Sequence, residues 1–127
     1  SASAPLPIER LRVLVVEDDD DVRASLQAML QALGARVDLA SSVREALAQL
    51  DATRYNGVLL DLRLPDGSGY TVASHTRASG SRNLTTPLVA LSAYHEADDR
   101  GDALFAAKFE KPNSVGRLRS ALDIFNG

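Results

Sequence analysis

Apolar residues along the chain alternate between short continuous runs and longer segments in which they recur at helical spacing. Strand-like runs occupy residues 11–16, 57–61, 88–91 and 104–109. Val37 and Leu39 alternate with polar neighbours, as is typical of a half-exposed strand at the edge of a sheet. The pattern therefore predicts five strands, each separated from the next by a stretch long enough for a helix.

The segments between the strands carry signals that start and stop helices. Asp19 or Asp20 can cap a first helix, which Gly34 ends, and Ser42 with Glu45 forms a capping box for a second. Further helices are predicted from about Ser68 to Ser79, near Glu96 to Ala103, and after a cap at Asn113 or Ser114. We expect the last helix to bury Val115, Leu118, Leu122 and Phe125.

Strict alternation of strands and helices indicates an α/β fold with a parallel sheet and helices on both faces. Right-handed crossovers leave few topologies for such a chain. We predict a doubly wound, five-stranded parallel sheet in a three-layer α/β/α arrangement, with the flavodoxin-like strand order 2-1-3-4-5. In that order the first and third strands are neighbours.

Polar side chains follow four of the predicted strands. Glu17 and Asp18 follow the first strand, Asp61 ends the third, Ser92 follows the fourth, and Lys111 follows the last. Because parallel strands end at the same edge of a sheet, these groups are predicted to converge there.

Three carboxylates in one place repel one another and destabilise the fold unless they share a cation. Oxygen ligands without His or Cys favour a hard ion, so Mg²⁺ is the predicted cofactor. A metal there would draw a phosphoryl group toward Asp61, whose carboxylate can attack phosphorus. Lys111 can then supply a cation for the phosphoryl oxygens and Ser92 a hydroxyl donor.

Composition narrows the class of protein. The chain has 127 residues, 45% of them hydrophobic and 24% charged, with a net charge of −3 and no cysteine. These values predict one globular domain over residues 10–127, preceded by a linker or a cloning remnant over residues 1–9. They give no electrostatic footprint for nucleic acid or for a membrane surface. We expect a cytoplasmic protein that contacts neither through this domain.

Four motifs occur in order and resemble the signatures of response-regulator receiver domains, the CheY-like domains of two-component signalling. They are Val15-Val16-Glu17-Asp18-Asp19, Leu60-Asp61 through Pro65-Asp66-Gly67-Ser68-Gly69, Leu88-Val89-Ala90-Leu91-Ser92-Ala93, and Lys111-Pro112. The resemblance covers roughly residues 10–126. It implies a phosphoprotein that acts in a phosphorelay.

The resemblance assigns a role to each matching residue. Asp61 would be the phosphoacceptor, Asp18 would ligate Mg²⁺ directly, Glu17 would act through a bound water, and the backbone carbonyl of Arg63 would complete the protein ligands. Ser92 would bind one phosphoryl oxygen and move with it, and Lys111 would pair with another. Ala93 would leave access to Asp61, and a cis bond before Pro112 would orient Lys111.

Two departures from the family pattern concern how the phosphorylated state is read out. Receiver domains usually carry an aromatic residue three positions before the lysine, and here that position is Lys108. The interval from Ser92 to Lys111 is also about three residues shorter than expected. Both changes fall on the face that commonly dimerises or docks partners, so we expect an altered readout through Ser92 and Lys108.

Three alternatives remain open from the sequence. The run from Asp18 to Val22 also fits the nucleophile motif of haloacid-dehalogenase-like phosphohydrolases, with Asp18 as nucleophile and Asp98-Asp99 as the acidic pair. A receiver-like module that is never phosphorylated is a second alternative. In the third, the acids of residues 18–21 only stabilise the N-terminus of the helix that follows, where negative charge is favoured. His75 and His95 are interpreted as surface or half-buried side chains rather than catalytic bases.

The predicted partners follow from the resemblance. A sensor histidine kinase or a histidine phosphotransfer protein would supply the phosphoryl group. Output would pass to a downstream protein or to the chain's own kinase, and a phosphorylation-dependent dimer is a further expectation. Whether the domain counts as an enzyme stays open, since it would catalyse its own phosphorylation and dephosphorylation and can belong to a hybrid kinase.

Overall fold

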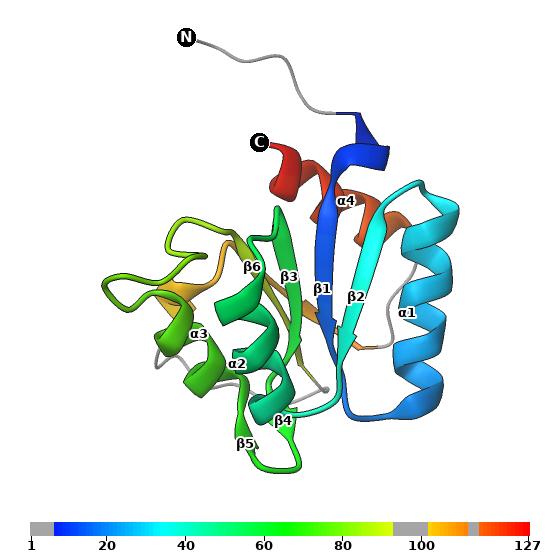
Figure 1. Cartoon of the computed structure of the whole chain (residues 1–127). Helices are drawn as coiled ribbons and strands as arrows, with labels where there is room; N and C mark the ends of the chain where they lie inside the picture. Colours follow the sequence, from blue (N-terminus) through cyan, green and yellow to red (C-terminus); the bar gives the residue numbers. More distant parts are fainter. Residues whose placement is uncertain (1–6, 93–101, 112–114) are drawn as a thin grey trace, which may run out of the picture.

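The computed structural model describes residues 7–92, 102–111 and 115–127, and its centre is a parallel sheet (Figure 1). The five strands lie in the order β2-β1-β3-β6-β7. Their bounds are β1 Arg12–Val16, β2 Arg36–Ala40, β3 Gly57–Asp61, β6 Leu88–Ser92 and β7 Ala107–Glu110. The predicted flavodoxin-like order 2-1-3-4-5 is therefore confirmed.

The described residues form four α-helices, which cover both faces of the sheet. They are α1 Asp20–Ala32, α2 Val43–Ala52, α3 Gly69–Thr76 and α4 Val115–Asn126. Helices α1 and α4 cover one face and α2 and α3 the other, which gives the three predicted layers. Short 3-10 turns, η1 Ile8–Arg10 and η2 Asp102–Leu104, and a small hairpin of β4 Arg63–Leu64 and β5 Gly67–Ser68 complete the described elements.

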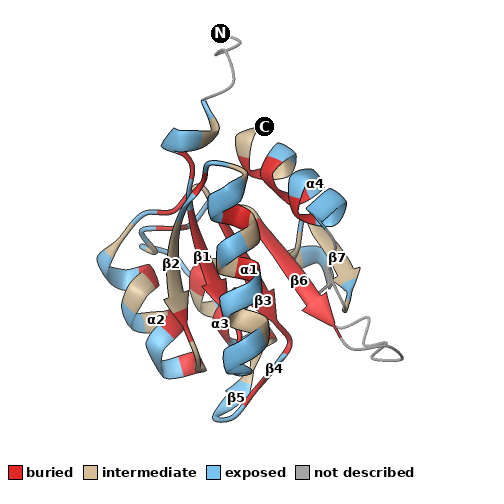
Figure 2. Cartoon of the chain, turned by 90° about the vertical axis from the view of Figure 1, so that its right-hand side faces the viewer, coloured by how far each residue is buried: buried red, intermediate tan, exposed pale blue. Residues whose placement is uncertain are grey.

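Each face of the sheet packs its own apolar core. Strands β3 and β6 are buried along their whole length, as Figure 2 shows, because helices cover them from both sides. Gly57 starts β3 beneath the ring of Phe125, and a Cβ there would lie 2.1 Å from ring atoms. Helix α4 can therefore reach the sheet only because residue 57 lacks a side chain.

Two helix starts match their predicted caps. The Asp19 side chain accepts hydrogen bonds from the backbone N–H groups of Asp21 and Val22, and Ser42 accepts one from Glu45. The capping box is only half formed, because the Glu45 carboxylate accepts from Ser41 N–H at 2.8 Å instead of from Ser42.

Three predicted details differ from the structure. The third helix ends at Thr76, where the following Arg77 turns its guanidinium onto the carbonyls of the next loop. The last strand begins at Ala107, because Leu104 belongs to the turn η2 and packs against the core on the α2 and α3 face of the sheet. Val115 is 48% exposed, since it opens α4 before the helix reaches the core.

Most of the helix predicted near residues 96–103 lies outside the described residues, as do Ala93, His95, Asp98, Asp99, Pro112 and the predicted caps Asn113 and Ser114.

Candidate functional site

Strand register delivers the predicted site residues to one edge of the sheet. Val16 of β1 pairs with Leu60 of β3, and Asp61 pairs with Leu91 of β6. Glu17 follows β1 directly, Asp61 ends β3, Ser92 ends β6, and Lys111 follows β7. The predicted convergence at this carboxyl edge is therefore observed.

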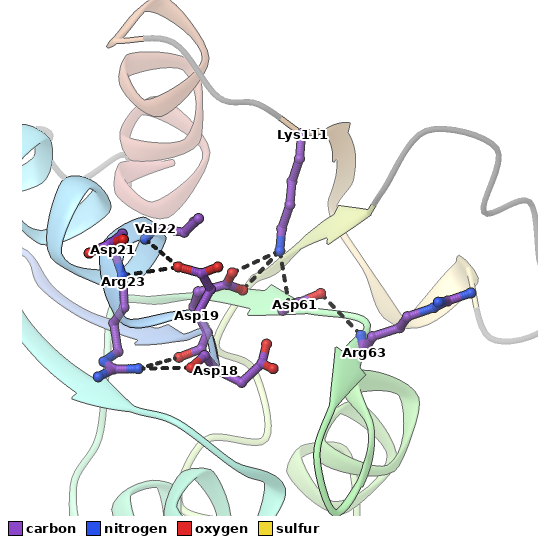
Figure 3. Close-up of polar contacts among 9 residues, drawn as sticks. Asp18, Asp19, Asp21, Val22, Arg23, Asp61, Arg63 and Lys111 are labelled. Atoms are coloured by element: carbon purple, nitrogen blue, oxygen red, sulfur yellow. Dashed lines mark hydrogen bonds and ion pairs between the residues drawn. The ribbon is translucent and has the colours of Figure 1, made fainter.

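Lys111 forms ion pairs with the two buried acids, Glu17 and Asp61. Its Nζ lies 2.9 Å from each carboxylate oxygen of Glu17 and 2.9 Å from Oδ2 of Asp61. Figure 3 shows the long Lys111 side chain reaching across the end of the sheet toward Asp61. Glu17 is 1% exposed and Asp61 5%, so water screens these ion pairs weakly.

Asp18 adds a third carboxylate, and this one is exposed. One oxygen from each of Glu17, Asp18 and Asp61 lies within 4.8 Å of the others. We call these three residues the acidic cluster. Their donors are all oxygen atoms, the set that a hard divalent cation such as Mg²⁺ takes, and the exposed Asp18 leaves room for metal-bound water. The residues present therefore fit the predicted ion.

The buried ionisable groups differ in the direction of their pKa shifts. Burial, reinforced by the neighbouring Asp61, raises the pKa of Glu17 to about 8 despite Lys111. Burial also pushes the pKa of Asp61 upward, but hydrogen bonds with Glu17, Lys111 and the Arg63 N–H outweigh it and leave that pKa below its usual range. Burial lowers the pKa of Lys111, yet the two carboxylates raise it overall. Asp61 thus stays ionised beside an ammonium group.

The segment after Asp61 folds back tightly on its carboxylate. Arg63 donates its backbone N–H to Asp61 Oδ1 at 3.0 Å and pairs with Ser68 in the β4–β5 hairpin. At Gly69 a Cβ would lie 2.5 Å from the backbone oxygen of Asp61. Only glycine permits this approach, which explains its place at the start of α3.

Ser92 lies on β6, the strand next to Asp61, and Lys108 lies one strand further out, on β7. Ser92 is buried, and its backbone carbonyl accepts a hydrogen bond from Lys111 N–H at 2.8 Å. Lys108, on β7, pairs with Ala90 in the middle of β6 and is half-buried. Ser92 therefore stands at the carboxyl edge, whereas Lys108 lies within β7, and the roles of both residues in readout stay predictions.

Sequence reasoning missed two residues that hold the site loops. The Arg23 guanidinium donates to the backbone oxygen of Glu17 at 2.9 Å and to Asp20 Oδ1 at 2.6 Å. It thereby fixes the turn that presents Glu17 and Asp18 (Figure 3). The only signal was its place one turn after the Asp19 cap.

Asp66 is the second residue that was missed. Its carboxylate accepts hydrogen bonds from the backbone N–H groups of Val43 at 2.7 Å and Arg44 at 3.0 Å, at the start of α2. In the sequence it sits between Pro65 and Gly67, a setting that indicates only a turn. These bonds hold its pKa below the usual value.

His75 is half-buried, as predicted; it lies on α3, and its Nε2 is 2.9 Å from Asp51 Oδ1. Across residues 7–92, 102–111 and 115–127, no helix has the length and apolar content needed to cross a membrane.

Comparison with known proteins agrees with this geometry. The family model described as the response regulator receiver domain matches residues 13–123. The sensor histidine kinase AtsR of Burkholderia thailandensis is 40% identical over 120 residues, which is 87% of this chain and 20% of that protein. The chain spans between a fifth and a half of the length of the first curated relatives that it matches.

Two solved structures are similar over most of their length. The receiver domain of the sensor histidine kinase PA1611 from Pseudomonas aeruginosa, with magnesium coordinated in its active-site cleft, is 30% identical with a TM-score of 0.81, covering 92% of this chain and 98% of that one. TrrA from Thermotoga maritima, in complex with Mg(2+)-BeF, is 28% identical with a TM-score of 0.81, covering 91% and 98%. A family match across most of the chain, on the fold expected for it, shows that this protein belongs to the response regulator receiver domains.

Proposed function

We propose that Asp61 accepts a phosphoryl group from a phosphohistidine and that this modification switches protein contacts. Receiver domains act with histidine kinases or phosphotransfer proteins, and the family match brings this chain into that class. The observation that carries the proposal is the Lys111 ammonium group, held 2.9 Å from a buried, ionised Asp61. It places a nucleophile and a cation for phosphoryl oxygens side by side.

The metal proposal concerns which residues hold Mg²⁺. Asp18 and Asp61 would ligate the ion directly, Glu17 through a water, and Arg63 through its backbone carbonyl. The oxygen-only acidic cluster supports this set, as does the magnesium in the solved Pseudomonas aeruginosa receiver domain. When bound, the ion neutralises charge on the transferring phosphoryl oxygens.

The transfer itself needs positioning and charge more than acid–base chemistry. A carboxylate oxygen of Asp61 attacks phosphorus, the phosphorus–nitrogen bond of the phosphohistidine breaks, and its electron pair stays on the imidazole. Lys111 then pairs with one phosphoryl oxygen, and the Ser92 hydroxyl donates to another. Because Lys111 already contacts both Glu17 and Asp61, it needs only a short shift to do so.

The new charge of roughly −1.5 to −2 then biases the surrounding structure. We propose that movement of Ser92 alters the face formed by β7 and α4, where Lys108 stands in place of the usual aromatic residue. The readers of that face would be a downstream protein, the chain's own kinase or a second copy. The domain proposed for this role is residues 10–127, acting in the cytoplasm without nucleic acid.

Incubation with acetyl phosphate and Mg²⁺, followed by intact mass, tests the proposal. We expect the wild-type chain to gain one phosphoryl group and Asp61→Asn to gain none. Asp51→Asn is a matched control, because Asp51 is an exposed acid paired with His75 away from the site. It should be labelled like the wild type.

One alternative keeps a specific observation in its favour. Lys108 departs from the family pattern at the readout position, which suits a receiver-like module that is never phosphorylated. A wild-type chain that binds Mg²⁺ but gains no mass supports that module. Labelling of Asp18 instead of Asp61 would indicate the phosphohydrolase mechanism.

A further inference from the structure

The loop that follows Asp61 is tied to a helix far from it in sequence. Asp66 lies in the turn of the β4–β5 hairpin, and its two carboxylate oxygens accept from consecutive N–H groups, Oδ1 from Val43 and Oδ2 from Arg44. Val43 and Arg44 are the first two residues of α2. We call this pair of hydrogen bonds the Asp66 latch.

The other end of the same hairpin contacts the proposed phosphoacceptor. Arg63, at the base of β4, donates its N–H to Asp61 Oδ1, and its carbonyl is a proposed metal ligand. The hairpin has only two strand pairs, Arg63 with Ser68 and Leu64 with Gly67. A shift of its turn is therefore passed to its base within one or two residues.

Apolar packing seats the hairpin on the same turn of α2. Leu64 is buried in the core that also holds Val43. A Cβ at Gly67 would lie 3.2 Å from Val43 Cγ2, so the backbone at Gly67 comes close to this side chain. The first turn of α2 is thus the fixed point against which the hairpin rests.

The latch does more than a helix cap requires. Ser42 already caps α2 by accepting from Glu45 N–H at 3.1 Å. Asp66 adds two bonds from outside the helix, across 22 and 23 residues of sequence. A capping residue next to its helix, such as Ser42, stabilises that helix alone. Asp66 also anchors the β4–β5 hairpin to the helix.

We propose that Asp66 is a positioning residue for the metal and phosphoryl site: by anchoring the hairpin to α2, it holds the Arg63 peptide in place beside Asp61. The inference rests on the proposed function of that site. Asp66 itself touches neither the acidic cluster nor Lys111 in the described contacts, so it acts through Arg63.

Mg²⁺ binding to metal-free protein, followed by backbone amide shifts in NMR, tests the inference without relying on phosphorylation. Asp66→Ala removes the latch, and Ser42→Ala removes the cap of the same helix while leaving the hairpin anchored. We expect Asp66→Ala to raise the Mg²⁺ Kd about tenfold, as is common when a group supporting a metal ligand is lost. Ser42→Ala should lower Tm by about 4 °C and leave the Kd unchanged.

Equal Mg²⁺ affinity in Asp66→Ala and the wild type would overturn the inference. So would an equal loss in Ser42→Ala, because loosening of α2 alone would then explain both. Asp66→Asn keeps one acceptor oxygen and should give an intermediate Kd. If Asp66→Ala does not fold, the comparison of Asp66→Asn with Ser42→Ala is interpreted in the same way.

Failure of the proposed function gives a different pattern. In that case the wild-type chain itself gains no mass from acetyl phosphate, whether or not it binds Mg²⁺ at the acidic cluster. A wild-type chain that binds Mg²⁺ and gains mass, with Asp66→Ala indistinguishable from it, contradicts the role of Asp66 alone.

Discussion

The two ends of the sheet both bury polar side chains, but they do so in opposite ways. At the amino edge, where β3 and β6 begin, Asn83 is fully buried and uncharged. Its Nδ2 donates to the carbonyls of Leu50 and Thr53, and its Oδ1 accepts from Tyr55 N–H and the Thr86 hydroxyl. Every hydrogen-bonding position of this amide is therefore used.

At the carboxyl edge the buried groups are ionisable, and acidic groups outnumber basic ones. Lys111 supplies one ammonium group for Glu17 and Asp61, and the exposed Asp18 adds a further acid. Burial keeps the pKa of Glu17 near 8, so this edge gives up stability in the absence of a cation. Buried polarity thus stabilises one end of the sheet and prepares the other for binding.

Asn83→Ala should show the largest effect. It removes the side-chain partner of a buried N–H and of two carbonyls, while the Thr86 hydroxyl keeps the Tyr55 carbonyl as acceptor, and we expect a loss of about 3 kcal/mol in the free energy of unfolding. Urea unfolding measures the loss, with the exposed Arg82→Ala as control. A loss below about 1 kcal/mol, or a changed Mg²⁺ Kd, would break the proposed division between the two edges.

Gly69→Ala tests the carboxyl edge next. The added methyl group would stand 2.5 Å from the Asp61 backbone oxygen, so the loop has to shift. We expect a loss of about 2 kcal/mol together with slower phosphorylation of Asp61. Gly80→Ala is the matched control: Gly80 has a φ of +86° with open space around it, so strain there should lower stability without slowing phosphorylation.

Glu17→Gln should stabilise the metal-free protein, whereas the two preceding substitutions destabilise it. The folded pKa of Glu17 is about 8 and its ordinary value is 4.5, so the folded chain holds a proton that the unfolded chain releases. Stability is therefore fully present below pH 4.5 and falls as pH rises toward 8. In metal-free buffer at pH 8, the free energy of unfolding of Glu17→Gln should exceed that of the wild type by about 1 kcal/mol. Wild-type stability that does not fall between pH 5 and 8 would contradict this.

Tyr55→Phe is expected to have the smallest effect. The Tyr55 hydroxyl donates to Asp38 Oδ2 at 2.7 Å, so its loss should cost about 1 kcal/mol at the amino edge. Mg²⁺ affinity and the rate of phosphorylation should equal those of the wild type. Any change in either would show that the two edges are coupled through the sheet.

The sequence predicted the strand order and the residues of the acidic cluster because both follow from local pattern. A buried run that ends in Asp61 fixes its edge of the sheet, and alternation of strands and helices leaves few topologies. Asn83, Arg23 and Asp66 escaped prediction because most of their partners are backbone groups. Such groups leave no signature in the sequence, and Asn83 and Asp66 find theirs on segments distant along the chain. The predicted burial of Val115 was wrong because helical spacing cannot show where a helix meets the core.

Trapping the acyl phosphate tests the central claim most directly. After incubation with acetyl phosphate, borohydride reduction converts a phosphorylated aspartate to homoserine, and peptide mass spectrometry locates it. We predict homoserine at position 61 in the wild type, dependent on Mg²⁺ and strongly reduced in Lys111→Ala. Homoserine at position 18, or at neither position in a chain that binds Mg²⁺, would contradict the assignment of Asp61 as the phosphoacceptor.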